Sequence, residues 1–440
     1  MACLREYEIL VKNPLGEPRF LVMDEYSVQW ALKLNAAGTL TMDLPSAFCT
    51  SGVRGYTLSD IGEDYRIEIW RTANGLRKLV GDSPFFVNKI SSKLANDGKR
   101  VVHVEGQNGN NLLDRRTNPY NSGDNNQKYD GAQSVTMSAF FCQVFERNFG
   151  AQARYYGGAV DNRRRLDGDI DGTNIAIFDT SKPYLICNAV PFNGATTINS
   201  DFSTTGNQSP LSLYKKATEY SFSQGQALFF NVVQVSNYAS IYPHFELRVY
   251  TGQQGVDRTQ AAGGANAVII SDTNFTIAEY EFTYDWSKAA RGFATTGKNN
   301  SGQAVRFSSD IPLILDTNPF ALREKSASSS QTGTALGAEA DRNLQSNKPV
   351  SQLSGSLVTD ETFIYGFHYD YGDKLTAVVE GIANTVFIDE ETCKLENGKE
   401  DLRVGFSTDL VRALTGAGEL VQAVVETQKQ VADLQAVIAS

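Results

Sequence analysis

Cysteine is scarce in this chain of 440 residues and is not arranged for its usual tasks. The five cysteines are an odd number and form no CxxC pair, so the sequence predicts neither a disulfide framework nor a zinc site. They are Cys3, Cys49, Cys142, Cys187 and Cys393. Scattered thiols of this kind favour a reducing compartment.

Long apolar runs and an excess of positive charge are also missing. No stretch approaches the ~20 apolar residues of a membrane span, and the N-terminal MACLREYEILVKNPLGEPRF has charges and a proline where a signal peptide needs an apolar core. We therefore expect a soluble chain made in the cytoplasm. The net charge of −10 argues against specific binding to nucleic acid, because affinity for phosphates comes mainly from clustered Lys and Arg.

Catalytic motifs are absent as well. The sequence contains no G-x-S-x-G, H-E-x-x-H, P-loop or G-x-G-x-x-G pattern, and His103, His244 and His368 are far apart along the chain. A histidine acts as a base only beside an orienting group, so we expect each of the three to be structural. The chain is predicted to be no enzyme and to need no cofactor.

The composition, 41% hydrophobic and 20% charged, is that of a globular protein, and the length exceeds what one core fills, so two to four domains are expected. Residues 26–44 alternate between apolar and polar side chains and predict a β-hairpin, with Gly38 supplying the positive φ of its turn. Similar alternations recur in DYRIEIW, SPFFVNKI, KRVVHVEG, ALFFNVVQV, HFELRVYTG, AEYEFTYDWS, NTVFIDEETCKL and EDLRVGFST. These segments predict a mainly β chain.

Three short amphipathic helices are predicted among the β segments, which makes the fold class α+β. The third carries Leu336, Ala340 and Leu344 at fourfold spacing and closes before Pro349, and the other two precede it. The first has Asp130 as its cap and ends at Gly150. Its apolar face is Val135, Ala139, Cys142, Phe145 and Phe149. The second begins with Ser209 as N-cap and Pro210 at the first helical position.

One acidic stretch, DGDIDGTN, matches the first half of a calcium-binding EF-hand loop through Asp167, Asp169 and Asp171. The twelfth position, which needs a bidentate Glu, is Phe178. A solvated acidic turn, a turn paired with the Arg163–Arg165 run, and a calcium site all remain open.

A second acidic stretch, FHYDYGDKLTAVVEG at 367–381, places His368 among carboxylates and tyrosines. Read as strand, turn and strand, it puts Gly372 at the turn and lets Asp373 bond to the nearby backbone. This interpretation accounts for every residue without catalysis.

The last residues, 407–440, carry a heptad pattern that predicts a coiled coil beginning near Glu419. Its self-association residues are Leu420, Val424, Val431, Leu434 and Ile438. A helix this short with one apolar seam is marginal alone, so it should pair with copies of itself. In isolated parallel coils, β-branched residues at a with Leu at d favour dimers.

Five segments stand out together: WALKLNAAGTLTMDLP, GQNGNNLLDRR, YDGAQSVTMSAFFCQVFERNFG, ALREKSAS and YGFHYDYGDKLTAVVEGIANTVFIDEE. In this order and at these distances they resemble the tail hub (tail-associated or baseplate hub) proteins of long-tailed bacteriophages. The resemblance covers roughly residues 20–406.

This resemblance implies a homotrimeric structural virion protein whose two tube-like antiparallel β domains form a ring that caps the distal end of the tail tube. Implied partners are further copies of the chain, the tail tube or distal tail protein, the tape measure protein, and a tail fibre or tail-tip protein at the coil. The implied location is the tail tip or baseplate of the virion, after assembly in the host cytoplasm.

The expected domain organisation combines the β pattern with the resemblance. It comprises an N-terminal tube-like β hub domain (1–112), an outer α/β domain with long loops (113–225), a β region completing the hub domains (226–320), a second β hub unit (321–406) and the coiled-coil helix (407–440). Longer family members carry wall-degrading or receptor-binding modules after the hub, and this chain is expected to leave those tasks to another polypeptide. Two alternatives stay open: a tail-associated cell-wall hydrolase, and a host-carbohydrate-binding adhesin built on the loops of 110–205.

Overall fold

The computed structural model describes residues 5–408 except 23–25, 47–54, 95–99, 118–134, 151, 154–163, 167–184, 189–196, 199–208, 224–225, 236–243, 275, 286–289, 291, 300–301, 310–322, 329–343, 345–346, 348–349, 359–362 and 397–398. The predicted coiled coil lies outside the described residues.

The described part of the chain is mainly β, as the sequence predicted, with two short α-helices. An N-terminal β unit contains β1 (Arg5–Lys12), β2 (Pro18–Leu21), β3 (Ser27–Lys33), β4 (Thr39–Pro45), β5 (Arg66–Ala73), β6 (Leu76–Leu79), β7 (Phe85–Leu94) and β8 (Arg100–Asn108). A C-terminal β unit contains β14 (Ile269–Ser271), β15 (Ile277–Asp285), β19 (Val350–Leu357), β20 (Lys374–Val379), β21 (Ile382–Glu396) and β22 (Lys399–Ser407).

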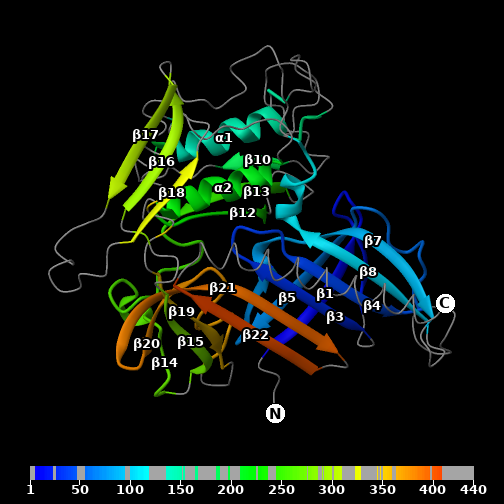
Figure 1. The fold of residues 1–440 in the computed structure, drawn as a ribbon. Helices are drawn as coiled ribbons and strands as arrows, with labels where there is room; N and C mark the ends of the chain where they lie inside the picture. Colours follow the sequence, from blue (N-terminus) through cyan, green and yellow to red (C-terminus); the bar gives the residue numbers. More distant parts are fainter. Residues whose placement is uncertain are drawn as a thin grey trace, which may run out of the picture.

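The middle of the chain supplies a separate layer, drawn above the two units in Figure 1. It contains β9 (Val135–Thr136), α1 (Met137–Asn148), β10 (Leu185–Asn188), β11 (Thr197–Ile198), α2 (Pro210–Ser223), β12 (Leu228–Val235), β13 (His244–Thr251), β16 (Gly292–Asn299), β17 (Gly302–Ser309) and β18 (Glu324–Ser328). Its strands form three small sheets of their own.

The two β units share one 14-stranded sheet with the main order β15-β19-β22-β21-β3-β4-β8-β7-β5-β1-β2. They meet at β21, whose 15 residues pair first with β20 and then with β3. In Figure 1 the β21–β22 hairpin runs across both units. All neighbours in the sheet are antiparallel except β14 and β20.

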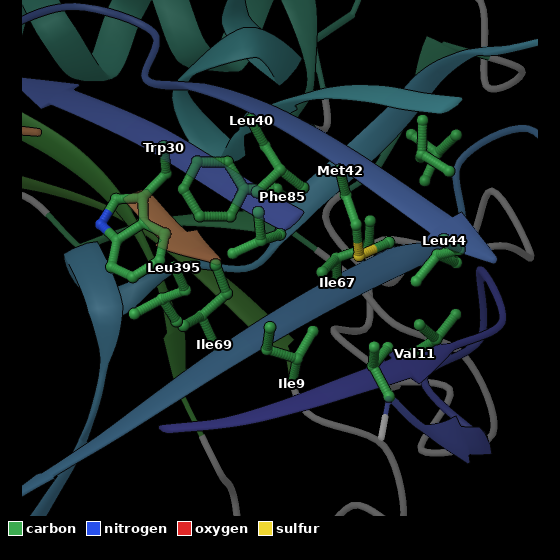
Figure 2. Packing of buried hydrophobic residues seen from close by; sticks show 14 of the residues in the cluster. Ile9, Val11, Trp30, Leu40, Met42, Leu44, Ile67, Ile69, Phe85 and Leu395 are labelled. Atoms are coloured by element: carbon green, nitrogen blue, oxygen red, sulfur yellow. The ribbon is translucent and has the colours of Figure 1, made fainter. Parts of the chain in front are cut away.

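The predicted hairpin at 26–44 is β3 and β4, and its alternation fills the core of the N-terminal unit. The inward side chains are fully or almost fully buried because strands present alternate residues to one face. They include Val28, Trp30, Leu32, Leu40, Met42 and Leu44. Figure 2 shows Trp30, Leu40, Met42 and Leu44 packed against Ile9, Ile67, Ile69 and Phe85 from neighbouring strands.

Cys393 and Leu395 of β21 also belong to this N-terminal core. Figure 2 shows Leu395 beside Trp30 and Ile69. The core of the N-terminal unit is therefore completed by residues about 360 positions further along the chain.

The turn of the hairpin differs from the prediction. The positive φ belongs to Asn35 (56°) and not to Gly38. Gly38 is needed for a different reason, since a Cβ there would lie 2.8 Å from Leu32 Cδ2 and 2.9 Å from the Ala31 carbonyl oxygen. Its N–H donates to the Asn108 side chain at 2.9 Å, which ties the turn to the end of β8.

Of the first two predicted helices, the second is confirmed and the first is shorter than expected, while most of the third lies outside the described residues. The Ser209 hydroxyl accepts from the Ser212 N–H at 3.2 Å, and α2 starts at Pro210. Val135 lies in β9, so α1 starts only at Met137. The buried side of α1 is aromatic and packs on α2 and β12 through Phe140, Phe141, Val144, Phe145 and Phe149.

The expected strand over 363–371 is wrong. This segment is a tight turn in which Tyr365 and Tyr369 bridge each other, and both rings are fully buried in the core of the C-terminal unit. The predicted turn at Gly372 is present, with φ 86°. The aromatic residues favoured a strand by propensity. The chain reverses instead at Gly366, which has φ 85°, and the N–H groups of Gly366 and His368 donate to the carbonyl oxygens of Tyr369 and Ile364.

Candidate functional site at the junction of the two β units

One buried carboxylate, Glu391 of β21, lies where the two units join. It occupies an inward position of the strand, in line with Cys393, and its side chain is 1% exposed. The Trp30 indole N–H donates to it at 2.8 Å, and the Tyr365 hydroxyl donates to its other oxygen. Strand β3 and the turn before β20 therefore both hold Glu391.

A buried arginine of the N-terminal unit forms an ion pair with this carboxylate. Arg71 takes an inward position of β5, and its side chain is 3% exposed. Its guanidinium lies 3.4 Å from Glu391, 2.7 Å from Asp370 Oδ1 and 4.3 Å from the ring centroid of Tyr365. Arg71 thus bonds two carboxylates of the C-terminal unit at once.

Lys78 of β6 completes the group, because its ammonium lies 2.9 Å from the second oxygen of Asp370. We call Arg71, Lys78, Tyr365, Asp370 and Glu391 the junction network. Burial alone would raise the pKa of Asp370, but Arg71 and Lys78 lower it to about 2. Burial and then Glu391 raise the pKa of Tyr365 well above its usual value.

These shifts fix the protonation states of Arg71, Tyr365 and Asp370. Burial would lower the pKa of Arg71, but Asp370 and Glu391 raise it well above its usual value. A general acid or base works best when its pKa lies near the working pH, and these groups are moved away from neutrality. The arrangement is suited to holding two units together.

The acidic turn around Gly372 is built from backbone contacts. Asp373 Oδ1 accepts from the Val256 N–H at 2.7 Å, while Oδ2 accepts from the Asp370 N–H at 3.0 Å and from Arg258 at 2.8 Å. His368 Nδ1 accepts from the Ile364 N–H at 2.9 Å. Both side chains are thus structural here, as the sequence interpretation proposed.

A polar row crosses the solvent face of the sheet. Directly paired residues on six adjacent strands, from β22 to β7, are Asp401, Lys394, Gln29, Thr41, Glu105 and Lys89. Five of the six are exposed, and Glu105 is half-buried. The opposite face of these strands packs into the N-terminal core, so the sheet is a two-sided wall that extends from one β unit into the other.

His103 lies beside this row between two carboxylates. Its Nδ1 is 2.5 Å from Asp43 Oδ1, and its Nε2 is 3.2 Å from Glu105 Oε1. His244 is buried, with Nε2 3.3 Å from Glu246. The three histidines are not brought together.

The predicted metal ligands Asp167, Asp169 and Asp171 lie outside the described residues, as do the predicted self-association residues Leu420, Val424, Val431, Leu434 and Ile438. Within the part of the chain that the structure describes, no group of three or more His, Cys, Asp or Glu is placed to hold a metal ion. Neither described helix is long and apolar enough to cross a membrane.

Sequence reasoning missed Arg71, Glu391 and the role of Asp370. A signal was present in two of the three, because Arg71 and Glu391 stand at positions where the alternation of their strands calls for an apolar side chain. A charge at such a position predicts a buried partner, but the sequence does not say which one.

Replacing His368 with alanine should lower the free energy of unfolding by about 1 kcal/mol, since it removes one backbone-to-side-chain hydrogen bond. His368→Asn, whose amide oxygen can accept in place of Nδ1, is the matched control and should lose less. Urea titration of both variants measures the difference. Equal stability of His368→Ala and the natural chain would contradict the structural role.

No family model matches the chain, and no curated protein matches it. Solved structures with a similar fold include the prophage tail protein gp18 from Listeria monocytogenes EGD-e, with 12% identity, a TM-score of 0.48, and 95% of this chain and 99% of that chain covered. The tail protein from Neisseria meningitidis MC58 has 10% identity, a TM-score of 0.47, and 92% and 97% covered.

The 43 kDa tail protein of prophage MuSo2 from Shewanella oneidensis has 11% identity and a TM-score of 0.48, over 91% of this chain and 98% of that chain. All three solved structures are described as tail proteins.

Proposed function

We propose that this chain is a structural subunit of a bacteriophage tail, a homotrimeric hub that caps the distal end of the tail tube. The observation that carries the proposal is the polar row, which continues across six strands drawn from both β units. A sheet with one polar face and one buried face is what the wall of a water-filled channel requires. Three copies, each contributing such a wall, would enclose the channel.

The charges of the polar row are better suited to letting DNA pass than to binding it. Lys394 and Lys89 are balanced by Asp401 and Glu105, and the remaining two residues are neutral. Strong attraction for a polyanion needs clustered positive charge, which this face lacks. DNA moving through the channel would therefore be neither held nor repelled strongly.

The junction network supports a structural role, because it holds the two β units together. Arg71, Asp370 and Glu391 tie the two β units through charge-assisted bonds in a buried setting, where such bonds are strong. The partners we propose are the tail tube or distal tail protein, the tape measure protein, and a fibre or tail-tip protein at the C-terminal coil. The proposed location is the tail tip of the virion, after assembly in the host cytoplasm.

We favour this hub over a cell-wall hydrolase. A cell-wall hydrolase of the glycosidase type needs two carboxylates with different pKa values facing a substrate. The paired carboxylates of the junction network, Asp370 and Glu391, both hold Arg71 instead. Clearing of purified cell wall by the isolated chain in a zymogram would favour the hydrolase.

The direct test compares the full chain with one ending at Thr408 by mass photometry. The full chain should have the mass of a trimer. The trimer of the shortened chain should dissociate at protein concentrations at least about tenfold higher than the trimer of the full chain. The reason is that the predicted coil buries the apolar seam through Leu420, Val424 and Val431, worth about 25 cal/mol per Å². Most of the association energy should remain in the β units.

A shortened chain that dissociates at the same concentration as the full chain would remove the role of residues 409–440. A full chain that remains a monomer at micromolar concentration would contradict the self-assembling hub itself.

A further inference from the structure

Eight strands of the large sheet form a wall with two open ends. In the order β15-β19-β22-β21-β3-β4-β8-β7, β15 has nine residues and pairs only with β19 among the strands that the structure describes. At the other end, β5 pairs only with Phe85 and Phe86 of β7, so residues 88–94 pair on one side only, with β8. Within the described part of the chain, each end leaves a row of backbone N–H and C=O groups without a strand partner.

The two ends of this wall run in opposite directions. Every neighbouring pair among the eight strands is antiparallel, and an even number of such strands gives the first and the last opposite directions. The rotation that builds a ring from copies keeps the direction and the faces of each wall. The β15 edge of one copy would therefore meet the β7 edge of the next as an antiparallel pair, with polar face beside polar face.

The polar face of β15 is acidic. Glu279 lies opposite Ser356, which lies opposite Gly405 of β22. Gly405 follows Asp401 of the polar row by four residues and so shares its face, as does Glu281 two residues after Glu279. Both glutamates are exposed and accept hydrogen bonds from hydroxyl groups, at 3.1 Å and 3.2 Å. Within the described residues, neither carboxylate forms an ion pair.

The polar face of β7 carries positive charge. Lys89 and Lys93 lie on this face, four residues apart, and both are exposed. Lys89 is already paired with Glu105 of its own chain at 2.7 Å. Lys93 has neither a hydrogen-bond nor an ion-pair partner in the part of the chain that the structure describes. Lys93 is therefore the cation that this edge can offer to a neighbour.

We propose that β15 of one copy pairs with residues 88–94 of β7 in the next copy, so that Glu279 and Glu281 face the neighbour's Lys93. We call this pairing the ring contact. It rests on the proposed ring of copies and assigns the strands and the charges that close it. Side chains directly opposite and diagonal across an antiparallel pair are within reach of one another, so both carboxylates can attract one lysine.

The other face of the ring contact is apolar. Tyr280 of β15 and Leu94 of β7 lie on the core side of their strands and are 39% and 65% exposed. Pairing of the two edges would bring these side chains together and remove part of their apolar surface from water. The contact joins different surfaces of the two copies, which is the head-to-tail kind that closes into a ring.

Other pairings of these edges fit less well. Two β15 strands would place carboxylates opposite carboxylates, and two β7 strands would bring one Lys93 close to another, both of which are unfavourable across strands. Strand β2, at the far end of the sheet, has four residues and starts with Pro18, so its edge is blocked. A foreign strand at β15 or β7 would compete with closure of the ring.

Charge reversal tests the ring contact by mass photometry on the full chain. Glu279→Lys, Glu281→Lys and, separately, Lys93→Glu should each make the trimer dissociate at protein concentrations at least about tenfold higher, because every contact in the ring gains like charges. The variant that combines all three substitutions restores opposite charges and should dissociate within about threefold of the natural chain. The matched control Glu396→Lys, Asp401→Lys makes the same change in net charge in the middle of the wall and should also stay within about threefold.

A cross-link tests which strands meet without reversing any charge. Chains with Glu281→Cys and chains with Lys93→Cys are dissociated by dilution, mixed, concentrated and treated with a short bismaleimide, with the natural chain showing the background from its own cysteines. The mixture should give a dimer band on a denaturing gel that neither variant gives alone, because each ring contact joins one β15 to one β7.

A trimer that tolerates both charge reversals would overturn the ring contact and leave the hub standing. So would a combined variant that dissociates as readily as its parts, or a dimer band from Glu281→Cys alone, which would assign β15 to a second β15. A full chain that stays monomeric at micromolar concentration would contradict the hub and the ring contact together.

Discussion

Replacing Arg71 with methionine should lower the free energy of unfolding by about 3–5 kcal/mol, the usual cost of removing one member of a buried ionic network. Methionine fills much of the space of the arginine stem, so the loss comes mainly from charge. Glu391, with a 1% exposed side chain, would lose its cation, and Asp370 would keep only Lys78. Guanidinium titration followed by intrinsic fluorescence measures the change.

The matched control is Lys89→Met on the polar row. Lys89 also pairs with a carboxylate, at 2.7 Å from Glu105, but its side chain is 63% exposed. Exposed pairs contribute about 1 kcal/mol or less, so this variant should stay close to the natural chain. The double variant Arg71→Met, Glu391→Gln should recover part of the loss, because the amide oxygen can still accept from Trp30. Equal effects of Arg71→Met and Lys89→Met would show that the network does not hold the two units.

The stability of the protein should decrease as the pH rises from about 4 to about 6, and Asp389→Asn should remove most of that decrease. Asp389 lies at the irregularity of β21 between Ile388 and Glu390 and is 6% exposed. Burial raises its pKa from 3.8 to about 6, despite the Ser407 hydroxyl, which donates to it at 2.7 Å, and Lys33 of β3. An acid with a higher pKa in the folded state binds its proton more tightly there, so its ionisation costs stability.

The size of this effect follows from the shift. A difference of about 2 pKa units corresponds to a loss of about 3 kcal/mol in the free energy of unfolding. This loss is complete once the pH exceeds 6 and absent below 3.8. At pH 8 Asp389→Asn should therefore be the more stable protein by up to about 3 kcal/mol, and near pH 4 the two should be similar. Asp370 acts in another window, because its lowered pKa removes stability only as the pH falls from 3.8 towards 2.

Thermal melts at pH 4, 5, 6 and 8 test the prediction, with Asp401→Asn as control because the Asp401 side chain is 68% exposed. The control should follow the natural chain at every pH. An Asp389→Asn protein that is less stable than the natural chain at pH 8 would contradict the prediction, because it would show that ionised Asp389 stabilises the fold.

Local patterns in the sequence were enough to predict many strands and helices. They were not enough to predict which of these elements pair or pack with one another. The alternation of Val28, Trp30 and Leu32 predicted β3 and its buried face, and Ser209 with Pro210 predicted the start of α2. Both signals lie within one turn or one strand, where the chain itself fixes which side chains are neighbours. The helix start at Met137 was missed because Val135 fits the helical spacing equally well.

The junction network shows why the rest could not be predicted. Arg71 and Glu391 are 320 residues apart, and their contact exists only because β21 leaves its own unit and pairs with β3. The aromatic residues at 365 and 369 suggested a strand, but the chain turns at Gly366 so that both rings enter the core of the C-terminal unit from a tight turn. Such choices depend on tertiary packing, which a single sequence does not display.

The length of β21 has a consequence for how the protein is made. Strand β3 leaves the ribosome early, but its partner on that side and the side chains of Cys393 and Leu395 emerge only near the end of synthesis. At roughly 5–20 residues per second, the nascent N-terminal unit waits on the order of tens of seconds with an unpaired strand and an incomplete core. During that interval it is open to wrong pairing with neighbouring nascent chains, so chaperone binding to β3 and slow, late folding of the whole chain are expected during translation.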